Sequence, residues 1–366
     1  MRGRLVLPFD WPPPGGSGVR RGVKFSKYLP KYGGPPVIYT PENPERLAYD
    51  ESLLGDVPEC AEIIRTRIVE PYGIYRRLVG RKGGRTEVNP VSGGRKSLMQ
   101  RLSLWVRGNF FIPDPRVSWV RPSVRFLKRY LREHPVDAVV TTGPPQSMHL
   151  IGLGLKKALG VRWLADFRDP WTEIFYYKHL GLGKFADSRH HRLERQVLDS
   201  ADTVIAVTPY VRDDFRRRTA TPVALITNGF DEDDFAGRTP AHHEGRFTIV
   251  HTGLFSADGN PLNLWDALAG KCAEDPAFAA RLQIRLAGKT DAEIMALYEQ
   301  GASLDHIAAQ VTVQEINGVN PKKKMQNLER VRQGGKGNLG GRGKRHAGQG
   351  TRKTQGRTRR DGAGRQ

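Results

Sequence analysis

The chain has 366 residues, a formal net charge of +21, 38% hydrophobic residues and two cysteines. This length exceeds that of a usual domain, so two domains are expected, each large enough to bury a core. Cys60 and Cys272 are too few for a disulfide framework or a four-cysteine zinc site, which fits a reducing cytoplasm. No apolar run is long enough to cross a bilayer, and Pro8 interrupts the apolar start at Leu5–Leu7, so no secretory leader is expected. These features predict a cytoplasmic protein that is soluble or peripheral to the membrane.

The positive charge is concentrated near the carboxyl end. Residues 321–366 hold 15 basic and 2 acidic side chains, which leaves a net charge of only +8 for the first 320 residues. A mildly basic body favours phosphorylated ligands or an anionic membrane surface, and it does not require nucleic acid.

Residues 1–230 alternate short apolar runs with segments of helical periodicity. One helix is expected to begin near Gly18, and two more are expected at 123–134 and 148–159. A further helix is expected to include Leu193 and Val197. Strands are expected at Arg4–Leu7, Pro36–Tyr39, Ile63–Val69, Ala138–Val140, Val161–Ala165, Thr203–Val207 and Val223–Ile226. This alternation predicts a doubly wound α/β domain, Rossmann-like, with a parallel sheet.

The stretch from Asp137 to Trp171 carries the strongest indication of a site. Its second strand is expected to end at Ala165, so that the chain leaves the sheet through Asp166, Arg168 and Asp169. Ligands of open parallel α/β sheets bind beyond the carboxyl ends of the strands, and two carboxylates with a guanidinium there suggest a site. A plain loop in which Arg168 pairs with one of the two aspartates explains the spacing equally well.

Other stretches give weaker indications. Gly15 and Gly16, before the first helix, would let a ligand approach the backbone, although a flexible turn also explains them. Aromatic and basic residues alternate between 102 and 121, which suits a membrane interface or the pocket for a lipid-linked acceptor; packing against the domain is the slightly favoured alternative. Adjacent His190 and His191 lack the i, i+4 spacing of paired ligands, so no metal site is expected.

A second α/β unit is expected after a polar linker at 231–246. A strand at Phe247–Val250, a helix bearing Leu264 and Leu268, and a strand at Leu282–Leu286 resemble the start of the first domain. This partial domain is expected to cover only 247–313, which is short of the usual length of about 100 residues or more.

Residues 314–366 are rich in glycine, arginine and lysine and cannot form a core. Three interpretations are open: a disordered basic tail, an RNA-binding arm, or a coding frame that slipped near Gln300. The third is favoured because the composition changes abruptly inside an unfinished fold.

Six motifs, each at the end of an expected strand, together resemble the family 4-like glycosyltransferases. They read FDWPPPGGSGVRR, TTGPPQSMHL, ADFRDPW, DSADTVIAVTPY, ITNGFD and HTG, and the resemblance covers roughly residues 1–300. It implies the GT-B fold, with two Rossmann-type domains. It also implies transfer of a sugar from a nucleotide-sugar to a polysaccharide or lipid-linked glycan, at the inner membrane face or in solution, with no cofactor and no bound metal.

The resemblance also implies roles for individual residues. Asp169, or alternatively Asp166, would act as the base or orient the acceptor hydroxyl, and Arg168 would hold their loop. The other residues expected to bind substrate are Gly15 and Gly16 beside the reacting sugar, Thr208 and Asn228 in the cleft, Gly253 through its amide to the donor diphosphate, and Lys289 as the nearest basic substitute there.

The donor half departs from the family's pattern. The expected Arg and Lys after HTG are replaced by SADGN, and the pair of glutamates that grips the donor is not found. The resemblance therefore predicts a weakened donor site and an impaired transferase. The alternatives are a protein that binds RNA through its basic tail and a non-catalytic scaffold.

Overall fold

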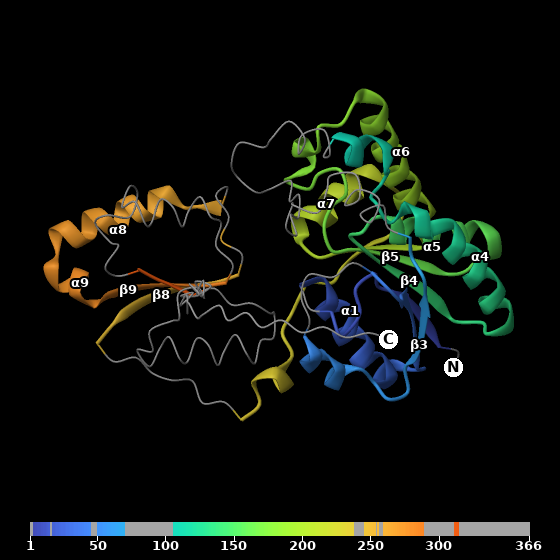
Figure 1. The fold of residues 1–366 in the computed structure, drawn as a ribbon, viewed down its shortest axis with the longest axis horizontal. Coiled ribbons are helices and arrows are strands. Elements are labelled where there is room, and N and C mark those ends of the chain that lie inside the picture. The colour runs from blue at the N-terminus through green and yellow to red at the C-terminus, as the bar shows by residue number, and fades with distance from the viewer. Residues whose placement is uncertain are drawn as a thin grey trace, which may run out of the picture.

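The computed structural model describes residues 3–14, 17–44, 50–69, 105–237, 245–253, 255 and 259–288, and the backbone of 311–314. Figure 1 shows two α/β units, the first running from blue to yellow-green and the second in orange. Within the described helices, none is long and apolar enough to span a membrane.

The first unit is built on a parallel sheet of seven strands in the order β3-β2-β1-β4-β5-β6-β7. The strands are β1 (Arg4–Leu7), β2 (Pro36–Pro41), β3 (Glu62–Thr66), β4 (Ala138–Gly143), β5 (Trp163–Phe167), β6 (Thr203–Ala206) and β7 (Val223–Leu225). The order reverses between β1 and β4. The predicted α/β fold with a parallel sheet is confirmed, and all seven expected strands are present.

Among the described residues, five α-helices connect these strands: α1 (Ser17–Tyr28), α4 (Val117–Glu133), α5 (Ser147–Leu159), α6 (Lys184–Ser200) and α7 (Pro209–Arg218). Gly160 ends α5 as predicted, with φ of 65° in the left-handed region where glycine is favoured. The helix expected at 123–134 begins six residues earlier, at Val117, and includes Pro122, which cannot donate the usual backbone hydrogen bond within the helix.

Strand alternation divides the core between the two faces of this sheet. Leu5 and Leu7 face the larger cluster, which α4, α5, α6 and α7 cover, whereas Val6 faces Val19 and Val23 of α1. Helices therefore lie on both faces, with α1 opposite α4 and α5 (Figure 1). This burial on both faces explains why the strands read as continuous apolar runs in the sequence.

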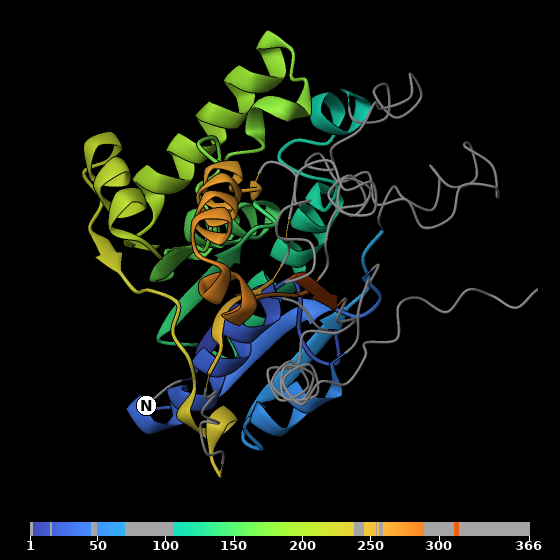
Figure 2. The same ribbon diagram turned by 90° about the vertical axis from the view of Figure 1, so that its left-hand side faces the viewer.

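The second unit has three parallel strands in the order β10-β9-β8. Its elements are β8 (Phe247–Thr252), α8 (Leu262–Glu274), α9 (Pro276–Arg281), β9 (Leu282–Ala287) and β10 (Val311–Gln314). Helix α8 packs over the sheet through Trp265 and Leu268 (Figures 1 and 2). Nearly all of 314–366 lies outside the described residues. The proposed change of reading frame near Gln300 stays a prediction.

Candidate functional site

A cavity of about 390 Å³ opens at the carboxyl edge of the large sheet, where the strand order reverses. Phe9 and Asp10 enter it after β1, Pro144–Gln146 after β4, and Arg168 and Asp169 after β5. Crevices at such switch points are where open α/β sheets bind ligands. The remaining wall comes from residues within 107–116 and 174–180 and from Gly18, Trp171 and His190.

Asp166 lies inside β5 and not in the following loop, because the strand runs two residues further than predicted. Alternation turns it toward α1, where Arg21 donates to both its carboxylate oxygens at 2.7 and 2.9 Å and Thr142 donates at 2.9 Å. Its residue exposure is only 2%. Such a doubly bonded, buried ion pair fixes α1 against the sheet and leaves Asp166 remote from solvent.

Arg168 lies across the first turn of α1. Its Nη2 donates to the carbonyl of Pro144, and a Cβ atom on Gly18 would overlap with its guanidinium. Burial lowers the pKa of Arg168, while nearby Asp10, Asp166 and Asp169 oppose that shift. Glycine at position 18 is therefore what lets the guanidinium approach the helix. The expected role of Arg168 in holding its loop stays a prediction.

Asp169 is an exposed residue on the cavity wall, and its carboxylate accepts no hydrogen bond from the described part of the chain. Desolvation raises the pKa of this carboxyl, and the charge of Arg168 partly offsets the increase. By contrast, Asp114 in the same wall already accepts hydrogen bonds from Ser147 and Arg116. Asp169 thus differs from its neighbours in being open to an incoming hydroxyl.

Side chains of helix α6 hold the loop after β5 in place. Glu194, fully buried, accepts from the Thr172 hydroxyl at 2.6 Å and pairs with Arg218. Nδ1 of His190 accepts from the Trp171 indole at 3.0 Å, and the histidine also bonds the backbone of Gly108. Burial lowers the pKa of His190, and its contacts with Trp171 and Gly108 position the loop.

A second histidine lies beneath the turn after β4. His149 is fully buried, stacks on Phe167 at 4.3 Å and bonds Thr141 through Nδ1 at 2.9 Å. Burial, with a smaller contribution from Arg168, lowers its pKa to about 3, so it is neutral. A Cβ on Gly143 would come within 2.6 Å of its Nε2, which explains the glycine before Pro144.

The basic and aromatic segment near residue 110 forms one side of the cavity. Arg107, Phe111 and Arg116 line it, and Asp114 caps the start of α5 by accepting from the backbone and hydroxyl of Ser147. This segment therefore lines the cavity and also packs against the domain, while its expected contact with a membrane or a lipid-linked acceptor stays a prediction. Sequence reasoning missed Asp10 and Asp114, because isolated aspartates in proline-rich stretches are typical of turns.

Thr208 and Asn228 are exposed, and both have structural partners. The Thr208 hydroxyl caps α7 by accepting from the backbone of Val211 at 3.2 Å. Asn228 accepts from Nη1 of Arg21 at 3.1 Å, which connects the end of β7 to the buried Asp166 pair. Neither is among the residues that line the cavity.

The amide of Gly253 is already engaged. It donates to the carbonyl of Ala287 at 2.9 Å, extending the pairing of β8 with β9. The expected donation from Gly253 to a diphosphate would require that bond to open. Gly15, Gly16 and Lys289, the other expected substrate-binding residues, lie outside the described residues.

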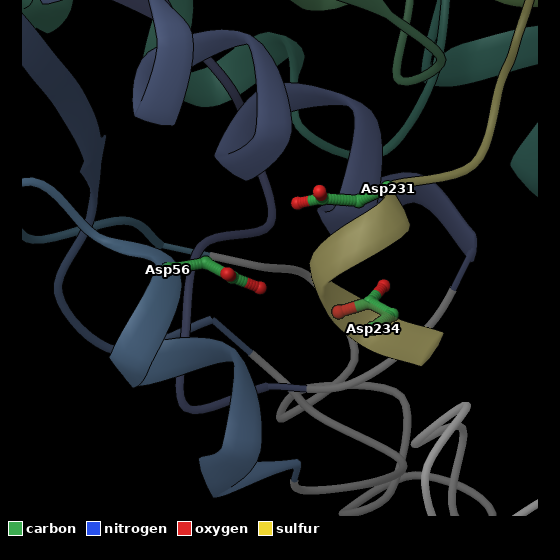
Figure 3. A group of neighbouring side chains, drawn as sticks. All are labelled: Asp56, Asp231 and Asp234. Carbon is green, nitrogen blue, oxygen red and sulfur yellow. The ribbon is translucent and has the colours of Figure 1, made fainter. Parts of the chain in front are cut away.

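Three carboxylates, from Asp56, Asp231 and Asp234, converge near the end of the first unit (Figure 3). They surround Lys24 of α1, whose Nζ lies 2.8, 2.6 and 3.0 Å from them, respectively. Lys27 and the Tyr28 hydroxyl also bond Asp231. The cluster is thus a set of ion pairs that attaches η4 (Glu232–Phe235), where the chain leaves the first unit, to α1.

A cavity at the switch point of a parallel α/β sheet is in the usual ligand-binding position of doubly wound folds. Residues 78–234, which include most of the cavity wall, match the model described as Glycosyltransferase Family 4. The predicted resemblance to this family is thereby confirmed over that segment.

Solved structures give further comparisons. The OtsA apo structure has a TM-score of 0.52 at 12% identity, covering 90% of this chain and 76% of that one, which shows a shared fold. TarM has a TM-score of 0.49 at 10% identity, covering 88% and 78%. The apo form of the lipopolysaccharide outer core galactosyltransferase WaaB has a TM-score of 0.48 at 12% identity, covering 92% and 72%. Among curated proteins, none matches the chain.

Proposed function

We propose that the protein transfers a sugar from a nucleotide-sugar donor to a hydroxyl of a glycan acceptor that binds in the switch-point cavity. The observation that carries this proposal is the environment of Asp169, an open carboxylate of raised pKa on the wall of that cavity, within the segment that matches the family. A base with a raised pKa accepts a proton more readily than an ordinary aspartate does.

In the proposed reaction, Asp169 accepts the proton of the acceptor hydroxyl. At the same time, the hydroxyl oxygen of the acceptor bonds the anomeric carbon of the donor sugar. The bond from that carbon to the nucleoside diphosphate breaks, and the diphosphate leaves with the electron pair. Arg168 and Glu194 act as positioning residues, because they hold the loop that carries Asp169. Asp166 acts through its pair with Arg21 and takes no proton.

The second unit would hold the donor, without a metal, and we expect it to do so weakly. The amide of Gly253 is engaged with Ala287. The glutamate pair of the family's donor site is not found in the sequence, and a site without such polar contacts loses affinity. Titration calorimetry with UDP-, GDP- and ADP-sugars checks this expectation; micromolar affinity for any of them would contradict it.

RNA binding and a purely scaffolding role are not favoured. RNA binding rests on the composition of residues 314–366 alone, while the family match includes most of the cavity wall.

The proposal is tested by release of the nucleoside diphosphate at millimolar donor concentration, with and without added oligosaccharides. We expect slow release that depends on one class of acceptor. Two results would refute transfer by this chain. The first is release of nucleoside diphosphate at the same rate with and without acceptor, and the second is no release with any donor under single-turnover conditions.

A further inference from the structure

Two buried polar atoms beside the turn after β4 have no hydrogen-bond partner in the described part of the protein. They are Oε1 of Gln146 and Nε2 of His149. Both lie close to one point, because they are 2.8 and 2.6 Å from the position that a Cβ would take on Gly143. Buried polar side-chain atoms are usually hydrogen-bonded, so this pair points to a bound group that bridges the two atoms.

The direction of the hydrogen bonds beneath this turn is fixed by Trp163. Its indole N–H can only donate, and it donates to Oγ1 of Thr141 at 2.9 Å. Thr141 is fully buried, and the acceptor that the described residues offer to its hydroxyl hydrogen is Nδ1 of His149, at 2.9 Å. Neutral His149 must therefore carry its proton on Nε2, the nitrogen that lies close to Oε1 of Gln146.

Gln146 lies between these buried hydrogen bonds and the cavity. The residue lines the cavity wall but is only 8% exposed, and its Oε1 is enclosed. Its Nε2 is not among the enclosed atoms, and it donates to no group of the described residues. The carbonyl end of the side chain is therefore on the buried side, with His149, and the amide N–H groups are left for the cavity.

We propose that Gln146 is a specificity-determining residue, which donates from its amide to an oxygen atom of the ligand in the cavity, and that a buried relay holds it in this orientation. In the relay, one water molecule accepts from Nε2–H of His149 and donates to Oε1 of Gln146. Water suits this position because it can accept and donate at once, and His149 is thus a positioning residue. That the ligand is a sugar rests on the proposed function, whereas the relay does not.

The relay is tested by the tautomer of His149 in the full chain with isotope-labelled histidine. Long-range proton–nitrogen NMR spectra show which ring nitrogen carries the proton, and His149→Phe identifies the signal of His149 among the ten histidines. We expect the proton on Nε2. A proton on Nδ1 would overturn the proposal, because His149 would then have no N–H to donate toward Gln146.

Binding of methyl glucoside, methyl galactoside and methyl mannoside, measured by saturation-transfer NMR, tests the role of Gln146. Gln146→Leu should lose about tenfold in affinity for the probe that binds most tightly, because it loses one hydrogen bond to the ligand. His149→Phe should also lose affinity, because the amide is no longer held, yet it should keep its urea midpoint, since it removes an unpartnered donor. His149→Gln can place an N–H donor near the position of Nε2 and should recover part of the affinity.

The matched control is Tyr39→Phe, which removes a buried hydroxyl that donates to Ser123 at 2.9 Å and does not line the cavity. It should lower stability and leave the affinity for the glycosides unchanged. Equal affinity of Gln146→Leu and wild type would overturn the proposal, and so would a wild type that binds none of the three glycosides. Failure of the proposed function would be seen separately, as glycoside binding that depends on Gln146 in a protein that transfers no sugar.

Discussion

Asp166 and Asp169 are three residues apart and have opposite environments. Asp166 is buried and saturated by Arg21 and Thr142, whereas Asp169 is exposed and accepts no hydrogen bond from the described residues. The first carboxylate therefore stabilises the fold, and the second is available to a substrate. Arg168, between them, is fixed by the Pro144 carbonyl and by its close approach to Gly18.

Gly18→Ala should displace Arg168 and lower transfer activity, because the new methyl group would overlap with the guanidinium. The matched control is Gly22→Ala in the same helix, where the nearest atom to a new Cβ is Pro8 Cβ at an ordinary 3.5 Å. That control should be more stable by about 0.5 to 1 kcal/mol, since alanine is the better helix former. Transfer rates and urea denaturation of both variants test this prediction. Equal activity of Gly18→Ala and wild type would show that the position of Arg168 is unimportant for transfer.

Asp169→Asn should raise the stability of the fold at neutral pH. The folded-state pKa of Asp169 is raised, so the folded protein binds its proton more tightly than the unfolded chain does, and stability falls as pH rises through that pKa. The amide cannot ionise and escapes this cost. Melting temperatures at pH 4 and pH 8 should show the variant gaining on the wild type at the higher pH only. A variant that is less stable at pH 8 would mean that the carboxylate is held by favourable contacts.

The boundaries of β5 show how much of an element the sequence could predict. All seven strands of the first sheet were predicted, because buried parallel strands read as apolar runs between turn residues. The predicted end of β5 at Ala165 was wrong, because an aspartate such as Asp166, taken without its partners, is typical of a loop. Only its partner Arg21, 145 positions earlier, makes the aspartate compatible with the strand. Long-range ion pairs of this kind are invisible to local patterns.

The attachment of η4 to α1 gives a prediction for that element. Burial alone would raise the pKa of Asp231, but hydrogen bonds from Lys24, Lys27 and Tyr28 outweigh it and hold the pKa well below its usual range. Asp231→Asn should lower the free energy of unfolding by about 3 kcal/mol near pH 7, because two lysines lose a buried partner.

Since a depressed carboxyl pKa contributes stability that is lost as pH falls, the difference between Asp231→Asn and wild type should shrink below about pH 4. Asp233→Asn is the control: its carboxylate also contacts Lys27 but is 71% exposed, so it should cost less than about 1 kcal/mol. Urea denaturation across pH measures both. A difference for Asp231→Asn that stays constant with pH would contradict the ion-pair account.

For the whole molecule, the family resemblance and the doubly wound sheet could be recognised because the motifs lie at strand ends in the order that the fold requires. The cavity could be located only in part. The segment after β5 was recognised, whereas Asp10 and Asp114 were not, since a wall assembled from segments more than a hundred residues apart has no local signature. The role expected of Gly253 was assigned without knowing that β9 continues to Ala287 and takes its amide.

The central claim is that an acceptor hydroxyl loses its proton to Asp169 inside the switch-point cavity. The direct measurement is the single-turnover rate of sugar transfer by Asp169→Asn and by wild type, at saturating donor and acceptor, with folding checked by circular dichroism. The variant should be slower by about 10² to 10⁴-fold, the usual contribution of a positioned base. A rate within threefold of wild type would show that the proton goes elsewhere.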